Sequence, residues 1–445
     1  MADSGGTTRV LATLAVLVRV ALVLAVIAVV VPLVVGEPGV LDRLLRGSSQ
    51  PVDSWTEASV VFTRDGATPK QRRELRSQLQ AHLGHHATLS VRFMRATVAD
   101  DPGFVASADD VLVDNTEDLR TTLEPAIGKK PAATFADNWE QQTSQLFRYA
   151  AGVRDNDGDA REQARQQLAA FVSDQAALLA DATRGRLSTD LAETTLQQQV
   201  DLLLFQIDAY GAHNYAQAYT LEREAFANMF AFGETVAAAA AGRNPERDRL
   251  SPRDEIAATI SRLFDEHVAL SNDVVRAGAN ASSEFGAAAA ALDSNTADLT
   301  HAMASLLGDA QARQFNRRWV NHIDQMMRYA VAVAENDVAA RTRLQRRLDS
   351  TMRGFGPALA KATGGRVRPE LLSNGMTTHQ YQMLDQISAF VAADYERAQE
   401  TAYEAYTHMH SVASRLGRAL GAAVVDGLPR GGAATGGGGT ASSAS

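Results

Sequence analysis

The chain has 445 residues, no cysteine, and 43 lysines and arginines against 52 aspartates and glutamates, which gives a net charge of −9. The absence of thiols excludes a disulfide framework, a thiolate metal site and a cysteine nucleophile. The negative net charge argues against a nucleic-acid-binding surface. With 45% hydrophobic residues the chain can bury ordinary cores, and its length suits two or three domains.

The first predicted element is an apolar run from Val10 to Val35, interrupted by Arg19. At about 1.5 Å per residue, this run can cross a hydrocarbon core of about 30 Å as one transmembrane helix. Arg9 precedes the run, Arg19 lies in its first half and Glu37 follows it, so we expect the N-terminus inside and the rest of the chain outside. A cleaved signal peptide is the other interpretation, but no small-x-small cleavage site follows. We therefore predict a single-pass membrane anchor over 1–36 and an extracytoplasmic body.

After a spacer of mixed polarity over 37–68, the sequence repeats itself. NTEDL at 115–119 matches NTADL at 295–299, which is an offset of 180 residues. FRYA with MRYA and QIDAY with QISAF are further matches at the same offset. So many matches at one offset indicate a tandem duplication, with copies over 69–242 and 251–421 and a short polar linker between them.

Both copies have the apolar spacing of helices. Hydrophobic residues recur at intervals of three and four, no stretch alternates as a strand does, and strong helix formers dominate. Turn signals such as Asp101-Pro102-Gly103 divide each copy into five or six helices of roughly 20 to 28 residues. The predicted fold class is all-α, with a transmembrane helix followed by two tandem homologous antiparallel helical bundles. The Gly/Ser/Ala-rich tail over 427–445 is predicted to be disordered.

Four predicted helices of the second copy each place a histidine on an otherwise apolar stripe, and methionines lie beside three of these histidines. Neutral imidazole and thioether groups suit copper, especially copper(I), when thiolates are absent. Helical bundles build copper or haem sites from such inward-facing ligands. The hypothesis is a copper site, or alternatively a haem site, in the second bundle. Its candidate ligands are His267, His322, His379, His408, Met326, Met383 and Met409.

The first copy offers a different interpretation of these positions. There the aligned residues are His86, Gln142, Gln199 and Asn228. A hydrogen-bonded polar layer that fixes helix register would explain both copies, because a buried polar group without a partner costs about 1 to 3 kcal/mol. His86 also has His82 one turn before it, and such a pair could chelate a divalent ion. The metal site and the polar layer both remain open at this point.

No enzyme motif is present: G-x-S-x-G, a P-loop, H-E-x-x-H and a Glu-x-x-His pair are all missing, so no enzymatic function is predicted. The segments EHVAL, NTADL, THQYQMLDQISAF and AYTHM resemble a family of bacterial cell-surface proteins with duplicated helical bundles. In some members of that family the bundles are found beside copper-amine-oxidase-like N-terminal domains, so the resemblance favours copper. We thus predict a membrane-anchored extracytoplasmic metal-binding protein. The alternative is a structural or protein-interaction module of the cell envelope, without metal, that holds an envelope protein partner.

Overall fold

The computed structural model describes residues 67–427. Within that range the chain forms twelve helices and no strand, which confirms the prediction of an all-α fold. No helix of the described part is long and apolar enough to span a bilayer. The predicted anchor over 1–36, nearly all of the spacer and the tail after Gly427 lie outside the described residues.

The helices repeat as the sequence does. The helices of the first repeat are α3 (Pro69–Val98), α4 (Pro102–Ile127), α5 (Lys129–Arg154), α6 (Gly158–Ala182), α7 (Thr189–Gly211) and α8 (Tyr215–Ala240). Those of the second repeat are α9 (Pro252–Ala279), α10 (Phe285–Leu307), α11 (Asp309–Ala334), α12 (Val338–Ala362), α13 (Pro369–Val391) and α14 (Tyr395–Gly427). Helices α5 and α11 start 180 residues apart, and so do α8 and α14. Helix α14 continues to Gly427, beyond the predicted end of the repeat at 421.

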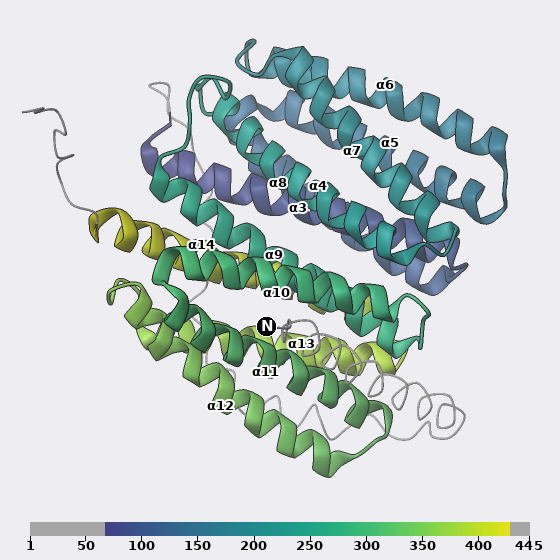
Figure 1. The fold of residues 1–445 in the computed structure, drawn as a ribbon. Coiled ribbons are helices and arrows are strands. Elements are labelled where there is room, and N and C mark those ends of the chain that lie inside the picture. Colours follow the sequence, from purple (N-terminus) through teal and green to yellow (C-terminus); the bar gives the residue numbers. More distant parts are fainter. Residues whose placement is uncertain (1–66, 428–445) are drawn as a thin grey trace, which may run out of the picture.

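Each repeat closes into a ring of helices. Every helix packs against the next one along the chain, and the first helix packs against the last, α3 against α8 and α9 against α14. In Figure 1 the first repeat lies above the second, and these two helix pairs meet where the repeats face each other. The later parts of α3 and α9 are therefore enclosed by other helices. Every residue from Leu83 to Thr97 and from Leu263 to Ala277 is buried.

Turn chemistry fixes the helix ends at equivalent places in the two repeats. Asn156 and Asn336 have φ of 54° and 53°, a left-handed conformation that asparagine tolerates and that ends the preceding helix. Asp157 then accepts a hydrogen bond from a backbone N–H of α6, and Asp337 does the same for α12. These are two of the turns that the sequence predicted.

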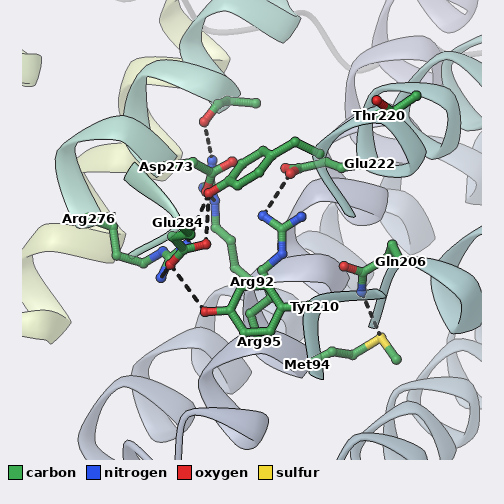
Figure 2. Close-up of polar contacts among 12 residues, drawn as sticks. Arg92, Met94, Arg95, Gln206, Tyr210, Thr220, Glu222, Asp273, Arg276 and Glu284 are labelled. Carbon is green, nitrogen blue, oxygen red and sulfur yellow. Dashed lines mark hydrogen bonds and ion pairs between the residues drawn. The ribbon is translucent and has the colours of Figure 1, made fainter. Parts of the chain in front are cut away.

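A buried network of charged side chains joins the repeats (Figure 2). Arg92 on α3 donates to Asp273 on α9 at 3.0 Å. Arg95 lies 2.9 Å from Glu222 on α8, and Arg276 lies 2.8 Å from Glu284, which precedes α10. The members of the network are Arg92, Arg95, Glu222, Asp273, Arg276 and Glu284, and all of them are buried. Because these charges are removed from water, each depends on its buried partner. Of the three pairs, Arg92–Asp273 is the one that crosses from the first repeat to the second.

The network also decides which carboxyl group is ionised. Burial, followed by the negative charge of Asp273, raises the pKa of Glu222 to about 8, so Glu222 holds a proton at neutral pH. Burial alone would raise the pKa of Asp273, but Arg92 and its neighbouring guanidinium groups hold that pKa below its ordinary value. Asp273 is therefore the ionised partner of Arg92.

Replacing Asp273 by alanine should lower the free energy of unfolding by about 3 to 5 kcal/mol, because Arg92 would keep a buried charge without its carboxylate. Asp298→Ala is the control, since Asp298 pairs with Arg223 at 2.7 Å but is 55% exposed, and it should cost at most about 1 kcal/mol. Urea denaturation of both variants measures the difference. Equal losses would show that the buried pair does not hold the repeats together.

Candidate metal centre

Three helices of the second repeat bring their histidines to one point. His267 lies in α9, His322 in α11 and His379 in α13, and the three side chains are at most 1% exposed. One ring nitrogen from each histidine lies within 4.8 Å of those of the other two. These three residues are called the histidine triad below. Three of the four histidines that the sequence predicted as ligands thus come together.

Aromatic and aliphatic side chains surround the histidine triad. The ring of Trp319 lies 4.5 Å from that of His267 and 4.7 Å from that of His322, measured between ring centroids. Met326, Met383 and Met409 are buried in the hydrophobic core of the same repeat. Their interior position agrees with the apolar stripes of the sequence, while their role as ligands stays a prediction.

Each histidine of the triad has at least one ring nitrogen without a hydrogen-bond partner among residues 67–427, while Nε2 of His267 lies 3.5 Å from Ser271 Oγ. His322 Nδ1 lies 2.6 Å from the carbonyl oxygen of Trp319. A carbonyl only accepts, so Nδ1 carries the proton and Nε2 keeps its lone pair. Among residues 67–427 this Nε2, Nδ1 of His267 and both ring nitrogens of His379 have no hydrogen-bond partner. A histidine that donates one N–H to a carbonyl and presents its other nitrogen is the usual arrangement of a metal ligand.

The protonation state also fits metal binding. Burial lowers the pKa of His322 to about 4, even though its hydrogen bond to Trp319 acts in the opposite direction. Burial lowers the pKa of His267 and His379 well below the ordinary value, and neighbouring histidines lower them further. The triad is therefore neutral at pH 7, which is the form that binds a metal.

His408, the fourth predicted histidine, does not join the triad. Its Nε2 lies 2.9 Å from the carbonyl oxygen of Gly375 on α13. The missing side chain at Gly375 brings α14 close to that carbonyl, since a Cβ there would lie 2.7 Å from Val412. The prediction that four imidazoles converge is therefore corrected to three, because His408 is hydrogen-bonded to the carbonyl oxygen of Gly375 instead.

The first repeat has a closed hydrogen-bonded layer at the equivalent positions. His86 packs on Trp139 at 4.6 Å, as His267 packs on Trp319. Its Nδ1 lies 3.0 Å from Asn115 and its Nε2 lies 3.3 Å from Gln142. Both ring nitrogens of His86 are thus engaged, which argues against the chelating pair that the sequence suggested there.

The second repeat lacks this closure although its equivalent asparagine keeps the same backbone contact. Asn115 donates to the carbonyl of His82 at 3.1 Å, and its counterpart Asn295 donates to that of Leu263 at 3.0 Å. Asn295 also donates to Glu266 at 2.8 Å, and its Oδ1, like Nδ1 of His267, has no partner among residues 67–427. An asparagine that binds the first helix of its repeat in both copies fits a scaffolding role. The sequence did not reveal that the Trp319 carbonyl orients His322. The W-x-x-H spacing within one helix is the only signal that could have suggested it.

Comparison of the chain with protein-family models, with curated proteins and with solved structures gave no match. The resemblance to bacterial cell-surface proteins therefore stays a prediction. What the histidine triad can do follows from its own geometry.

Acidification should destabilise the metal-free protein. In the unfolded chain histidine binds a proton near its ordinary pKa of 6.5, whereas native His322 does so only at about 4. Between these values the unfolded state holds more protons, so the free energy of unfolding falls as the pH decreases. Each such histidine contributes up to about 1.4 kcal/mol per pH unit.

The variant His322→Gln should reduce this pH dependence, because it removes one of the contributing groups. Urea denaturation from about pH 7 to about pH 5 gives the slope for both proteins. An unchanged slope in the variant would mean that native His322 is protonated as readily as unfolded histidine.

Proposed function

We propose that this protein binds one copper(I) ion through His267, His322 and His379 in its second bundle. The observation that carries the proposal is the difference between the repeats. The first repeat closes its polar layer with amide hydrogen bonds, whereas the second leaves inward imidazole nitrogens without partners. A structural polar layer explains the first arrangement. It does not explain the second, in which each unpaired nitrogen costs free energy that a metal bond would recover.

The charge of the site favours a monovalent ion. Three neutral imidazoles leave the full charge of the ion in a buried place, and the cost of burying charge is lower for copper(I) than for a divalent ion. The nearest carboxylates along α9 are engaged elsewhere: Asp265 lies 2.7 Å from His410, and Glu266 lies 2.9 Å from Arg223. Copper also binds imidazole nitrogen well. Metal–nitrogen bonds of about 2.0 to 2.1 Å require only that the three rings move slightly inward.

Haem, the second cofactor suggested by the sequence, fits this geometry less well. Haem iron takes protein ligands on the two faces of the porphyrin ring, one on each face. The histidine triad instead directs three nitrogens at one point, and Trp319 packs against two of its rings. A single ion matches that arrangement.

The predicted anchor over 1–36 would place the copper-binding body on the outer side of a membrane. In that location the protein would bind copper at the cell envelope without using thiols, which an oxidising compartment converts to disulfides. We assign the histidine triad a binding role, not a catalytic one.

The test is a titration of the full-length chain with copper(I) in competition with a chromophoric chelator. Wild type should bind one equivalent. His322→Gln combined with His379→Gln should bind none at this site, and this double variant should fold because it copies Gln142 and Gln199 of the first repeat. His86→Gln is the matched control and should retain one equivalent. Saturation to about a hundred times the dissociation constant should raise the free energy of unfolding by about 2.7 kcal/mol.

Parallel titrations with zinc(II) and haem test the identity of the ligand. Stronger binding of zinc than of copper(I), after allowance for chelator affinity, would overturn the charge argument. Equal copper binding by wild type and the double variant would overturn the site. The protein would then be better described as a metal-free module of the cell envelope.

A further inference from the structure

A second set of polar residues meets where the repeats face each other, on a different side of α9 from the histidine triad. Ser77 Oγ on α3 lies 2.8 Å from His410 Nε2 on α14. His410 Nδ1 lies 2.7 Å from the carboxylate of Asp265 on α9. His410 and Asp265 are buried, and Ser77 is partly exposed. A hydroxyl, an imidazole and a buried carboxylate in this order form the geometry of a nucleophile, its base and the group that orients the base.

The ends of the hydrogen-bond chain fix its direction. Arg418 can only donate, and it donates to Ser414 Oγ at 2.5 Å. Ser414 Oγ lies 3.0 Å from Ser77 Oγ. At the other end, Asp265 accepts from His410 Nδ1; burial raises the pKa of this carboxyl group, and His410 acts in the opposite direction. The consistent arrangement therefore has Ser414 donating to Ser77, Ser77 donating to His410 Nε2, and His410 Nδ1 donating to Asp265, so the Ser77 hydroxyl points its proton at the base.

The fold does not require polar groups at these positions. In helices α3 and α9 equivalent residues are 181 apart, as for His86 and His267, and in α8 and α14 they are 180 apart. The counterparts of Ser77, His410 and Asp265 are then Ala258, Phe230 and Gly84. A Cβ on Gly84 would lie 3.4 Å from the ring of Phe230, so this equivalent place is apolar and closely packed.

The surface beside Ser77 is rich in positive charge. Arg418 reaches the surface, and the charges of four side chains act on it: the carboxylate of Glu74, whose effect is the largest of the four, and the guanidinium groups of Arg73, Arg76 and Arg415. Arg76 is held by Asp254 at 2.6 Å. A substrate that carries a negative charge would be attracted to this surface.

From these observations we propose that Ser77 is the nucleophile of an acyl-transfer site that cleaves esters with a negatively charged acyl group. Ser77 Oγ attacks the ester carbonyl, and His410 Nε2 takes the hydroxyl proton. As the carbon–oxygen bond to the leaving alcohol breaks, His410 returns this proton to the alcohol oxygen, and the acyl group remains on Ser77. Water then attacks the acyl-serine with His410 as base, which releases the carboxylic acid and restores the hydroxyl.

Asp265 is a positioning residue in this reaction, because it holds His410 in the tautomer whose Nε2 accepts the proton. Arg418 supplies positive charge next to the nucleophile, where the oxyanion of the tetrahedral intermediate forms. The structure gives the site no glycine-rich nucleophile turn, so the sequence motifs of serine hydrolases cannot detect it.

The test uses the metal-free full-length chain and two activated esters, the p-nitrophenyl monoester of succinic acid and p-nitrophenyl acetate. The expected result is release of p-nitrophenolate together with a succinyl group on Ser77, located by peptide mass spectrometry. Acylation of Ser77, counted as adduct on this residue, should be faster with the succinyl ester than with the neutral acetate. Release of p-nitrophenolate is not compared, because the free carboxylate of the succinyl ester attacks its own ester carbonyl in solution.

Three variants copy the residue that stands at the equivalent place of the other repeat, so their sizes suit the packing of the helices, although His410→Phe also removes the partner of the buried Asp265. Ser77→Ala should form no adduct at this position. His410→Phe should slow acylation of Ser77 about a hundredfold or more, because general base catalysis is lost. Arg418→Ala, which copies Ala238, should remove most of the preference for the anionic ester. Thermal unfolding of each variant checks that it is folded.

Acylation of Ser77 at the same rate in wild type and His410→Phe would overturn the proposal, and so would an adduct found only on other residues of folded wild type. The chain from Arg418 to Asp265 would then be a structural link between the repeats. Neither result bears on the copper titration, because that site uses other side chains and the esters are tested without metal.

Discussion

A polar side chain buried within a helical bundle must find a partner there, and the duplication places this requirement at the same interior positions twice. In the first repeat His86 meets it with Asn115 and Gln142. In the second repeat two of the amide positions hold His322 and His379, and across the histidine triad four ring nitrogens lack partners among residues 67–427. Each unpartnered nitrogen costs about 1 to 3 kcal/mol of folding free energy, which is large beside the roughly 5 to 15 kcal/mol that stabilises a typical domain. Binding of one metal ion can recover free energy of this order.

The same duplication explains how the repeats are held against each other. Arg92 and Asp273 occupy equivalent positions, 181 residues apart, and bind each other across the interface. Divergence of one ancestral position into opposite charges gives an attraction that two identical repeats could not have. Elsewhere the interface has an aromatic contact, with Phe104 of α4 stacked on Phe390 of α13 at 6.0 Å between ring centroids. A buried charged pair and an aromatic contact together fix which faces of the bundles meet.

Helices, turns and the repeat were predictable because they depend on local signals: spacing of apolar residues, asparagine and glycine at turns, and recurrence at one offset. The three positions of the histidine triad were predicted from the same spacing of apolar residues. His408 did not, because its partner is a carbonyl that Gly375 exposes by bringing two helices close. The relay of Ser77, His410 and Asp265 was also beyond sequence reasoning. Its members are 333 and 145 residues apart and meet only because the two bundles pack together.

The buried stretch of α9 from Leu263 to Ala277 has neighbours on every side. It therefore contributes residues both to the histidine triad and to the hydrogen-bonded set of Ser77, His410 and Asp265. Residues two apart on a helix point in different directions, so His267 faces the interior of its bundle while Asp265 faces α14. Glu266, between them, faces Arg223 on α8. Each of these three residues thus faces a different neighbour. His267 Nδ1 has no hydrogen-bond partner among residues 67–427, and the same holds for the side-chain amide of Asn272 on this helix. A surface helix could leave such groups to water. Because α9 cannot, its unpaired nitrogens indicate a ligand more strongly than the same histidines would on an exposed face.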